Sequence, residues 1–175
     1  YSIGYMKGDR NLTRYWFFMI FFIANMQIII LSDNFLQLFF GWEGVGLASY
    51  ALIGFWNSDE KKDFVGSLNH KIRGLKQYYS PTHAGTKAFV TTKIGDVIFL
   101  IGILLLFYYA GTFDFVSLSS NTNWATILID KGMFVPIAIL IFGGAIGKSA
   151  QFPLQEWLPD AMAGPTSVSG SHSCK

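Results

Sequence analysis

Three charged residues lie inside otherwise apolar stretches of this sequence. Glu43 lies within FFGWEGVG, Asp96 within KIGDV, and Lys148 at the end of FGGAIGK. Burial in an apolar setting favours the neutral form of a carboxyl or amine, so such a group must be neutral, paired or hydrated. A group held in this way can take up and release protons. The chemistry that these residues indicate is therefore proton transfer.

Glu43 is the ninth residue of the apolar block from Phe35 to Trp56, which would place it roughly 12 Å from one end of a helix. A charge at that depth of a bilayer costs at least about 2.5–3.5 kcal/mol on insertion scales. The neighbouring glycines allow another helix to come close, and they do not form a dinucleotide fingerprint, because no strand precedes them. We expect a proton carrier. The alternative is a structural glutamate that is hydrogen-bonded between helices.

Lys148 follows a run of small residues that would let it pack deeply against another helix. A desolvated lysine can exchange protons near neutral pH. The alternative is a lysine at a helix end whose amine reaches the membrane surface. Pro153 and Pro159 follow it, so the helix must break there. Broken helices at membrane depth are tolerated where they line a cavity, which favours a functional lysine.

The remaining titratable residues have weaker signals. Asp96 could take up protons near one membrane face, or it could be a capping or interface carboxyl paired with Lys93. Glu156 and Asp160 flank a tryptophan in the broken segment, and we expect them to be interfacial rather than catalytic. His70 and His83 lie in a polar segment without partners at metal-ligand spacing, so we expect both to be solvated.

The composition favours a membrane protein. Of the 175 residues, 51% are hydrophobic, 17% are aromatic and only 14% are charged, against about 25% charged residues in an average soluble domain. The net charge of +2 is too small to indicate a nucleic-acid partner. The single cysteine excludes an intrachain disulfide. The first apolar block is too long for a cleavable signal peptide, so we expect none.

The apolar residues form four blocks of membrane-spanning length. We predict an all-α, polytopic transmembrane helix bundle with spans at 15–32, 35–56, 86–110 and 132–165, the last of them broken. The intervening segments are 1–14, a polar loop at 57–85, a loop at 111–131 and a tail at 166–175. Within the polar loop we expect one short amphipathic helix.

Basic residues alternate between successive linkers, which sets an orientation. The segment before the first span carries three, the linker at 32–34 none, and the linker at 111–130 none. The long linker up to residue 93 carries seven, which are Lys61, Lys62, Lys71, Arg73, Lys76, Lys87 and Lys93. By the positive-inside rule, segments 1–14 and 57–85 are cytoplasmic, or on the matrix side in an organelle, and 111–131 is external.

Three stretches of the sequence resemble the antiporter-like membrane subunits of complex I, the proton-pumping NADH:quinone oxidoreductase. The first is GWEGVGL at 41–47, followed by SY and LIGF, and the second is KAFV at 87–90 leading into IGDV. The longest is GKSAQ at 147–151, continuing through PLQ and WLPDAMAGPT. Within the family, the pattern is most similar to the branch called subunit 5, or subunit L in bacteria. The resemblance covers about residues 12–169.

This resemblance implies a function and a site. It implies a segment of a subunit of about 14 to 16 helices, with Glu43 and Lys148 as a buried pair in a first half-channel and Asp96 near its cytoplasmic entrance. It implies an enzyme subunit without redox chemistry of its own, since NADH, FMN, iron–sulfur clusters and quinone belong to other subunits. The implied partners are other complex I membrane subunits, the lipid bilayer and protons. We expect a prokaryotic cell membrane, with the mitochondrial inner membrane as the alternative.

Two features depart from the family. The polar loop is longer than in typical bacterial members, and residues Gly170 to Lys175 do not match. A one-base shift in their codons can restore the expected continuation Ala-Leu-Ile-His-Ala, so we expect a frameshift artefact or a truncating mutation. Two other functions stay open. One is the large subunit of a multi-subunit cation/proton antiporter, and the other is a non-functional membrane fragment.

Overall fold

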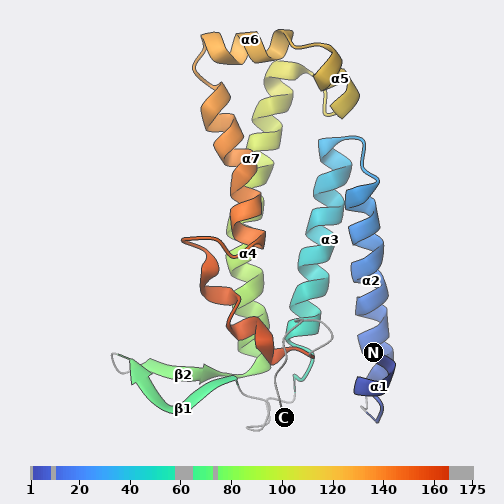
Figure 1. The fold of residues 1–175 in the computed structure, drawn as a ribbon, viewed down its shortest axis with the longest axis vertical. Coiled ribbons are helices and arrows are strands. Elements are labelled where there is room, and N and C mark those ends of the chain that lie inside the picture. The colour runs from blue at the N-terminus through green and yellow to red at the C-terminus, as the bar shows by residue number, and fades with distance from the viewer. Residues whose placement is uncertain (1, 9–10, 58–64, 73–74, 166–175) are drawn as a thin grey trace.

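The computed structural model describes residues 2–8, 11–57, 65–72 and 75–165. Four long helices run along the molecule, and short elements lie at its two ends (Figure 1). The long helices are α2 (Leu12–Ile30), α3 (Phe35–Ile53), α4 (Pro81–Ala110) and α7 (Phe134–Lys148). The predicted all-α bundle with a broken last helix is confirmed. The expected frameshift or truncation concerns residues 170–175, which lie outside the described residues.

Helices α2 and α3 form an antiparallel hairpin. Asn34 starts α3, because its side chain accepts a hydrogen bond from the Gln37 amide at 2.8 Å. A glycine lets the two helices approach closely, since a Cβ atom added at Gly44 would overlap the side chain of Asn25. The Asn25 side chain is buried there and donates to the Phe21 carbonyl at 2.8 Å.

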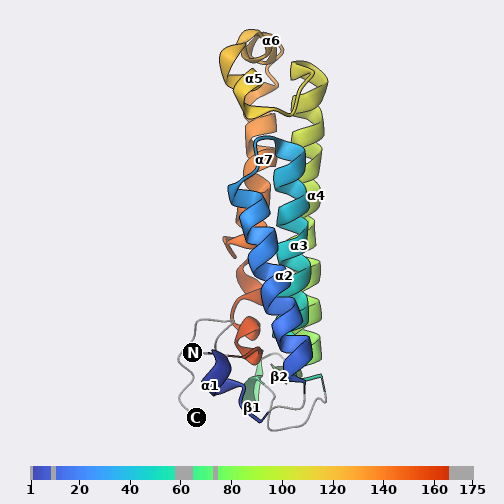
Figure 2. The ribbon, with the colours of Figure 1, turned by 90° about the vertical axis from the view of Figure 1, so that its right-hand side faces the viewer.

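Helix α4 pairs with α7 through glycines. A Cβ atom added at Gly95 would lie 3.0 Å from the carbonyl oxygen of Gly143 and from Cα of Gly147. The two backbones therefore nearly touch where the buried charges of α4 and α7 meet. Helix α3 packs on the other side of α4, so α4 is central and contacts both neighbours (Figures 1 and 2).

One end of the bundle carries helices α5 (Phe115–Ser120) and α6 (Asn123–Asp130). Here the α2–α3 turn is joined to the α4–α5 turn, because the Phe35 amide donates to Phe113 O at 3.0 Å and the Phe115 amide donates to Asp33 O at 2.9 Å. A buried cluster of Leu106, Leu118, Leu128 and Ile137 holds α5 and α6 against α4 and α7. The two linkers without basic residues therefore lie at the same end.

The opposite end carries α1 (Ser2–Tyr5) and a two-stranded antiparallel hairpin (Figure 1). Strands β1 (Val65–Ile72) and β2 (Leu75–Tyr79) lie in the polar loop, where we expected one short amphipathic helix. In the described part of this loop, at 65–72 and 75–79, the expectation is therefore wrong. Valine, isoleucine and tyrosine on either side of Gly74 are more typical of a hairpin than of a helix.

Helix α4 begins at Pro81, earlier than the span expected at 86–110. Ser80 caps it through a 3.3 Å hydrogen bond from the His83 amide, and Pro81 occupies the first turn. This start signal was present in the sequence and was overlooked. As a result, Lys87 and Lys93 lie on the helix rather than in the linker before it.

Helix α7 ends abruptly at Lys148. Ala150 takes a left-handed conformation with φ of 49°, and the Gln151 amide donates back to Ile146 O at 3.0 Å, as in a Schellman motif. Two short 3-10 helices follow, η2 (Gln155–Trp157) and η3 (Asp160–Ala163). The Ala161 side chain packs against Ile53, Ala84 and Ala88, which places η3 beside α3 and α4.

Among the described residues, three helices are long and apolar enough to cross a membrane, namely α2, α3 and α4. Helices α6 and α7 together form a fourth candidate that is bent by 109°. Since α7 has only 15 residues, it is about 22 Å long and needs the segment after its break to complete a crossing. The chain is a multi-pass membrane protein by the length and composition of these helices.

Candidate proton-transfer site

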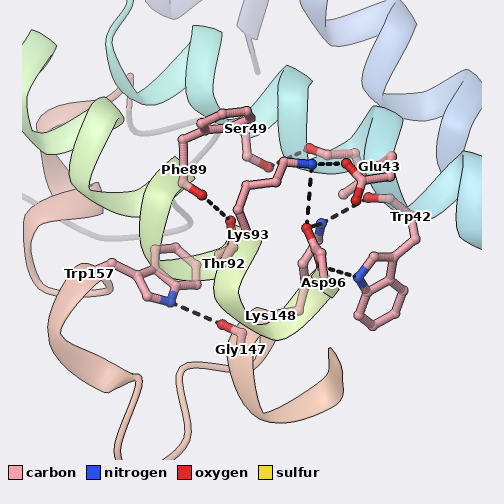
Figure 3. Close-up of polar contacts among 11 residues, drawn as sticks. Trp42, Glu43, Ser49, Phe89, Thr92, Lys93, Asp96, Gly147, Lys148 and Trp157 are labelled. Atoms are coloured by element: carbon pink, nitrogen blue, oxygen red, sulfur yellow. Dashed lines mark hydrogen bonds and ion pairs between the residues drawn. The ribbon is translucent and has the colours of Figure 1, made fainter. Parts of the chain in front are cut away.

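Four charged side chains meet between three helices, α3, α4 and the end of α7 (Figure 3). Glu43 comes from α3, Lys93 and Asp96 come from α4, and Lys148 comes from the end of α7. The three residues predicted from the sequence are therefore brought together. Lys93 joins them as a fourth member, and we call these four residues the charge cluster.

Asp96 is the most buried member of the charge cluster, with 1% of its side chain exposed. Its Oδ1 atom accepts a hydrogen bond from the indole nitrogen of Trp42 at 2.6 Å. Its Oδ2 atom lies 3.6 Å from Nζ of Lys93 and 4.0 Å from Nζ of Lys148. Among the described residues, Oδ2 has no hydrogen-bond partner. The amines of Lys93 and Lys148 therefore both approach the carboxylate of Asp96.

Lys148 is held mainly by α3. Its Nζ atom donates to the Trp42 carbonyl at 2.8 Å and lies 5.2 Å from the centre of the Trp42 ring. One lone pair of that carbonyl can serve the hydrogen bond within α3, and the other can accept the hydrogen bond from the ammonium. Gly46 makes room, since a Cβ atom there would lie 2.9 Å from Nζ of Lys148. The lysine therefore does not reach to the membrane surface.

Glu43 pairs with Lys93. No ion pair between Glu43 and Lys148 occurs in the described part of the chain, although the family resemblance implied this pair. The two residues are connected through Lys93 and Asp96 instead (Figure 3). The interpretation of Asp96 as a partner of Lys93 matches this geometry in part, because Asp96 also faces Lys148 and Trp42.

The charge cluster is balanced when every member is ionised, with two carboxylates against two ammonium groups. Buried charges are tolerated when they are paired in this way. Removing one proton from either amine would leave the cluster with a net negative charge. The proton on one amine is therefore coupled electrostatically to the positions of the other three groups.

A cavity of about 200 Å³ lies beside Lys148. It is bounded by α2, α3, α4, α7 and η2, and its polar lining includes Ser49, Tyr50, Thr92 and Lys148. A space of this size can hold several waters when it has polar partners. A larger cavity of about 380 Å³ lies among apolar side chains of α5, α6 and α7, away from the charge cluster.

The acids of the broken segment lie outside the charge cluster. Asp160 accepts an ion-paired hydrogen bond from Lys87 at 2.7 Å, and the more exposed Glu156 lies 3.9 Å from the same amine. Trp157 donates to the Gly147 carbonyl at 3.1 Å, so this carbonyl in the last turn of α7 has a partner. His83 lies in the first turn of α4, and His70 lies in β1.

Sequence reasoning missed Trp42 as a contact of both Asp96 and Lys148, and it missed Lys93 as the partner of Glu43. One signal existed for Lys93, which precedes Asp96 by three residues and so shares a helix face with it. The Trp42 contacts depend on how α3, α4 and α7 pack against one another. No spacing within a single helix carries that information.

A balanced charge cluster beside a broken membrane helix is typical of proteins that move ions across membranes. The sequence matches the family described as NADH:quinone oxidoreductase/Mrp antiporter, transmembrane, over residues 72–170. The chain belongs to this family.

Several proteins are similar over nearly the whole chain. NADH-quinone oxidoreductase subunit L of Rickettsia felis is 41% identical, and the match covers 97% of this chain and 24% of that protein. The Escherichia coli K12 protein of the same name is 38% identical, with 97% and 24% covered. The chloroplastic NAD(P)H-quinone oxidoreductase subunit 5 of Cryptomeria japonica is 39% identical, with 97% and 20% covered.

A solved structure of an Mrp complex from Dietzia sp. DQ12-45-1b contains a similar chain. It is 29% identical with a TM-score of 0.61, and the match covers 89% of this chain and 15% of that one. The present chain therefore spans about a quarter or less of the length of the proteins it matches.

Proposed function

We propose that this chain is a segment of a proton-translocating membrane subunit of an NADH:quinone oxidoreductase. The observation that carries the proposal is the charge cluster, in which Asp96 lies 4.0 Å from the amine of Lys148 at the end of a broken helix. The similarity of 38–41% to proteins named subunit L supports the oxidoreductase rather than another transporter.

In the proposed mechanism, Lys93 moves between two acids. It pairs with Glu43, and Oδ2 of Asp96 lies only 3.6 Å from its amine. A shift of Lys93 toward Asp96 would neutralise the acid that attracts Lys148. Lys148 could then release its proton through the neighbouring cavity, and return of Lys93 to Glu43 would favour reloading. In this mechanism Lys148 keeps the proton-exchanging role expected from the sequence, whereas Glu43 acts on it through Lys93, and Asp96 faces the amine of Lys148 instead of only serving proton entry.

The remaining parts of the proposed function lie outside this chain. Electron transfer from NADH to quinone would take place in other subunits, and this segment would contribute no redox cofactor. The subunit would assemble with other membrane subunits of the complex. We place it in a prokaryotic cell membrane, since the similar proteins named above include bacterial ones at 38–41% identity.

A second candidate is the large subunit of a cation/proton antiporter. The similarity to a chain of the Mrp complex favours it. The two candidates differ in what drives transport. An oxidoreductase subunit moves protons only while its complex reduces quinone. An antiporter instead exchanges protons for another cation, so a gradient of that cation drives proton movement.

The test uses the full-length subunit in its complex, reconstituted in vesicles. Electron transfer and proton transport are measured together for Glu43→Gln and Lys148→Ala. We expect proton transport to fall about tenfold or more, the scale of losing a proton-transfer group. The double variant should lose no more than the worse single variant, because the residues act as one unit.

Matched controls of the same residue types are available outside the charge cluster. Glu156→Gln removes an exposed carboxylate outside the charge cluster, and Lys131→Ala removes an amine at the far end of the bundle. Both should transport normally. Normal proton transport in Glu43→Gln or Lys148→Ala would refute the assigned roles, and transport that needs a cation gradient but no electron donor would favour the antiporter.

A further inference from the structure

We propose that Trp42 is a positioning residue that fixes the distance between Asp96 and Lys148. It contacts both charges, because its indole N–H donates to Oδ1 of Asp96 at 2.6 Å and its carbonyl accepts from Nζ of Lys148 at 2.8 Å. This inference rests on the proposed function for its consequence in transport. The geometry it assigns to Trp42 can be tested separately.

The indole bond orients the buried carboxylate. A carboxylate held at one oxygen cannot rotate freely, so the Trp42 bond directs Oδ2 of Asp96 toward the two amines. A neutral donor bonded to a charged acceptor makes a short and strong hydrogen bond, as the 2.6 Å separation indicates. Trp42 thus keeps the acid aimed at Lys93 and Lys148 without neutralising it.

Trp42 also holds the amine of Lys148 in place. The Trp42 carbonyl and the face of its ring both contact the ammonium of Lys148, the ring at 5.2 Å from its centre. The ring is braced by Phe99 of α4 at 5.5 Å. Helix α7 ends at Lys148, so no following turn of that helix restrains the amine. The contacts with Trp42 of α3 restrain it instead.

The positions of Trp42 and Glu43 in the sequence explain why one helix can control both amines. They are adjacent, so they project from α3 at angles about 100° apart. Trp42 reaches Asp96 and Lys148, whereas Glu43 reaches Lys93. Movement of α3 would therefore change both lysine contacts at once, and Trp42 would transmit the change to Asp96.

The first test measures the indole resonances of the full-length subunit in lipid nanodiscs with ¹⁵N-labelled tryptophan. Trp42→Phe identifies the Trp42 signal. We expect the Trp42 indole proton to lie far downfield and to move upfield by a measurable shift in Asp96→Asn, because its charged acceptor becomes neutral. The matched control is Trp124, whose indole donates to the Leu118 carbonyl at 2.9 Å. Its signal should not move.

A Trp42 signal that does not respond to Asp96→Asn would overturn the proposal, whether or not the subunit transports protons. The nanodisc measurement therefore does not depend on the proposed function. It also does not require Trp42→Phe to fold well, since a second tryptophan variant, Trp42→Tyr, can identify the same signal.

The second test compares Trp42→Phe with Trp124→Phe in the full-length subunit. Phenylalanine keeps an aromatic ring and the backbone carbonyl but removes the N–H donor. We expect Trp42→Phe to lower the protons moved per electron pair at least severalfold, because the Asp96 carboxylate is no longer held with Oδ2 toward the two amines. The pH at half-maximal transport should change as well, since Trp42 acts on a group that faces Lys93, Lys148 and, through Lys93, Glu43.

Trp124→Phe should leave both readouts unchanged. A merely structural role for Trp42 would lower the amount of assembled complex and leave the pH dependence and the proton yield per electron pair as they were. That result would overturn the proposal even if Lys148→Ala abolishes transport. If Lys148→Ala transports normally, the proposed function fails, and the nanodisc measurement alone decides the Trp42 geometry.

Discussion

Glu43 of α3 forms its ion pair with Lys93 of α4, and this pair lies next to Asp96 rather than beside Lys148. The Glu43 side chain is 31% exposed and the Lys93 side chain is 29% exposed. The pair therefore forms the more accessible half of the charge cluster, and Asp96 with Lys148 forms the buried half. Lys93 is the only amine in the charge cluster that contacts both acids at under 4 Å.

The first prediction concerns the energetics of that pair. Lys93→Met should destabilise this chain more than Glu43→Gln, because it leaves two acids facing the one remaining amine. The double variant should be less destabilised than the sum of the single variants, with a coupling of about 1–3 kcal/mol. Unfolding in mixed micelles would measure this. Additive effects would mean that the Glu43–Lys93 pair does not form.

The second prediction concerns Gly46. Gly46→Ala would place a Cβ atom 2.9 Å from Nζ of Lys148 and 4.0 Å from Oδ2 of Asp96. The lysine end is flexible, so we expect it to move off the Trp42 carbonyl while the helices keep their packing. Proton transport by the full-length subunit should fall at least severalfold, with a change in the free energy of unfolding below about 1 kcal/mol.

The control for Gly46 is Gly4 in α1, where an added Cβ atom meets nothing within 4 Å. Gly4→Ala should leave transport and unfolding unchanged. Equal transport by Gly46→Ala and Gly4→Ala would show that proton transport does not need the hydrogen bond from Lys148 to the Trp42 carbonyl.

The third prediction concerns the anchor of the broken segment. Lys87 of α4 holds Asp160 of η3 at 2.7 Å, and the exposed fractions of these side chains are 27% and 15%. Asp160→Asn should release η3 from α4. It should lower the free energy of unfolding by about 1–3 kcal/mol, the range for losing a hydrogen bond to a charged group in a partly buried site. Limited proteolysis after Ala150 should become faster.

Glu156→Gln is the matched control for that anchor, because its carboxylate is 77% exposed and lies 3.9 Å from the same amine. An exposed pair of this kind contributes little to stability. If Glu156→Gln accelerates proteolysis as much as Asp160→Asn does, the anchor is not specific to Asp160.

The sequence was sufficient for much of the fold. Apolar blocks of about 20 residues predict spanning helices because the bilayer core sets their length. Pro153 and Pro159 predict the break because proline cannot continue a helix. The small residues Gly143 and Gly147 predict close packing, but they do not reveal that their partner is Gly95 of α4. Local patterns fix the elements, whereas the pairing of elements depends on contacts between distant segments.

The same distinction explains the partial result at the site. Glu43, Asp96 and Lys148 were recognisable one by one, since each is a charge in an apolar block. Their distances to one another depend on the relative rotation of α3, α4 and α7. The sequence therefore indicated a Glu43–Lys148 pair through family resemblance, whereas the structure places Lys93 beside Glu43. The β-hairpin was missed because its strands lie in a polar segment with weak periodicity.

The fourth prediction concerns pH at the α5 end. Asp114 caps α5, and hydrogen bonds from the Ser117 hydroxyl and the Ser117 amide lower the pKa of its carboxyl below 3.8. A carboxyl whose pKa is lowered by folding contributes stability above its unfolded value of 3.8, and this contribution is lost as the pH falls through the lower, folded value. The Ser117 amide should therefore lose protection from hydrogen exchange only below pH 3.8.

Asp114→Asn supplies the control for this effect. Asparagine also caps helices but does not titrate in this range, so protection of the Ser117 amide should not depend on pH after correction for intrinsic exchange. Equal pH dependence in both proteins would show that another group is responsible for the loss.

The last prediction concerns the direction in which the chain crosses the membrane. The α2–α3 and α4–α5 turns are joined at one end, and β1 lies at the other (Figure 1). Basic residues are concentrated at the β1 end, which the positive-inside rule places in the cytoplasm. In a Cys174→Ser background, Ser67→Cys of β1 and Ser119→Cys of α5 should react with an impermeant maleimide from opposite sides of the membrane. Ser119 should be labelled in intact cells, and Ser67 only after permeabilisation. Labelling of both positions in intact cells would contradict the four-span arrangement and would remove the charge cluster from the membrane interior.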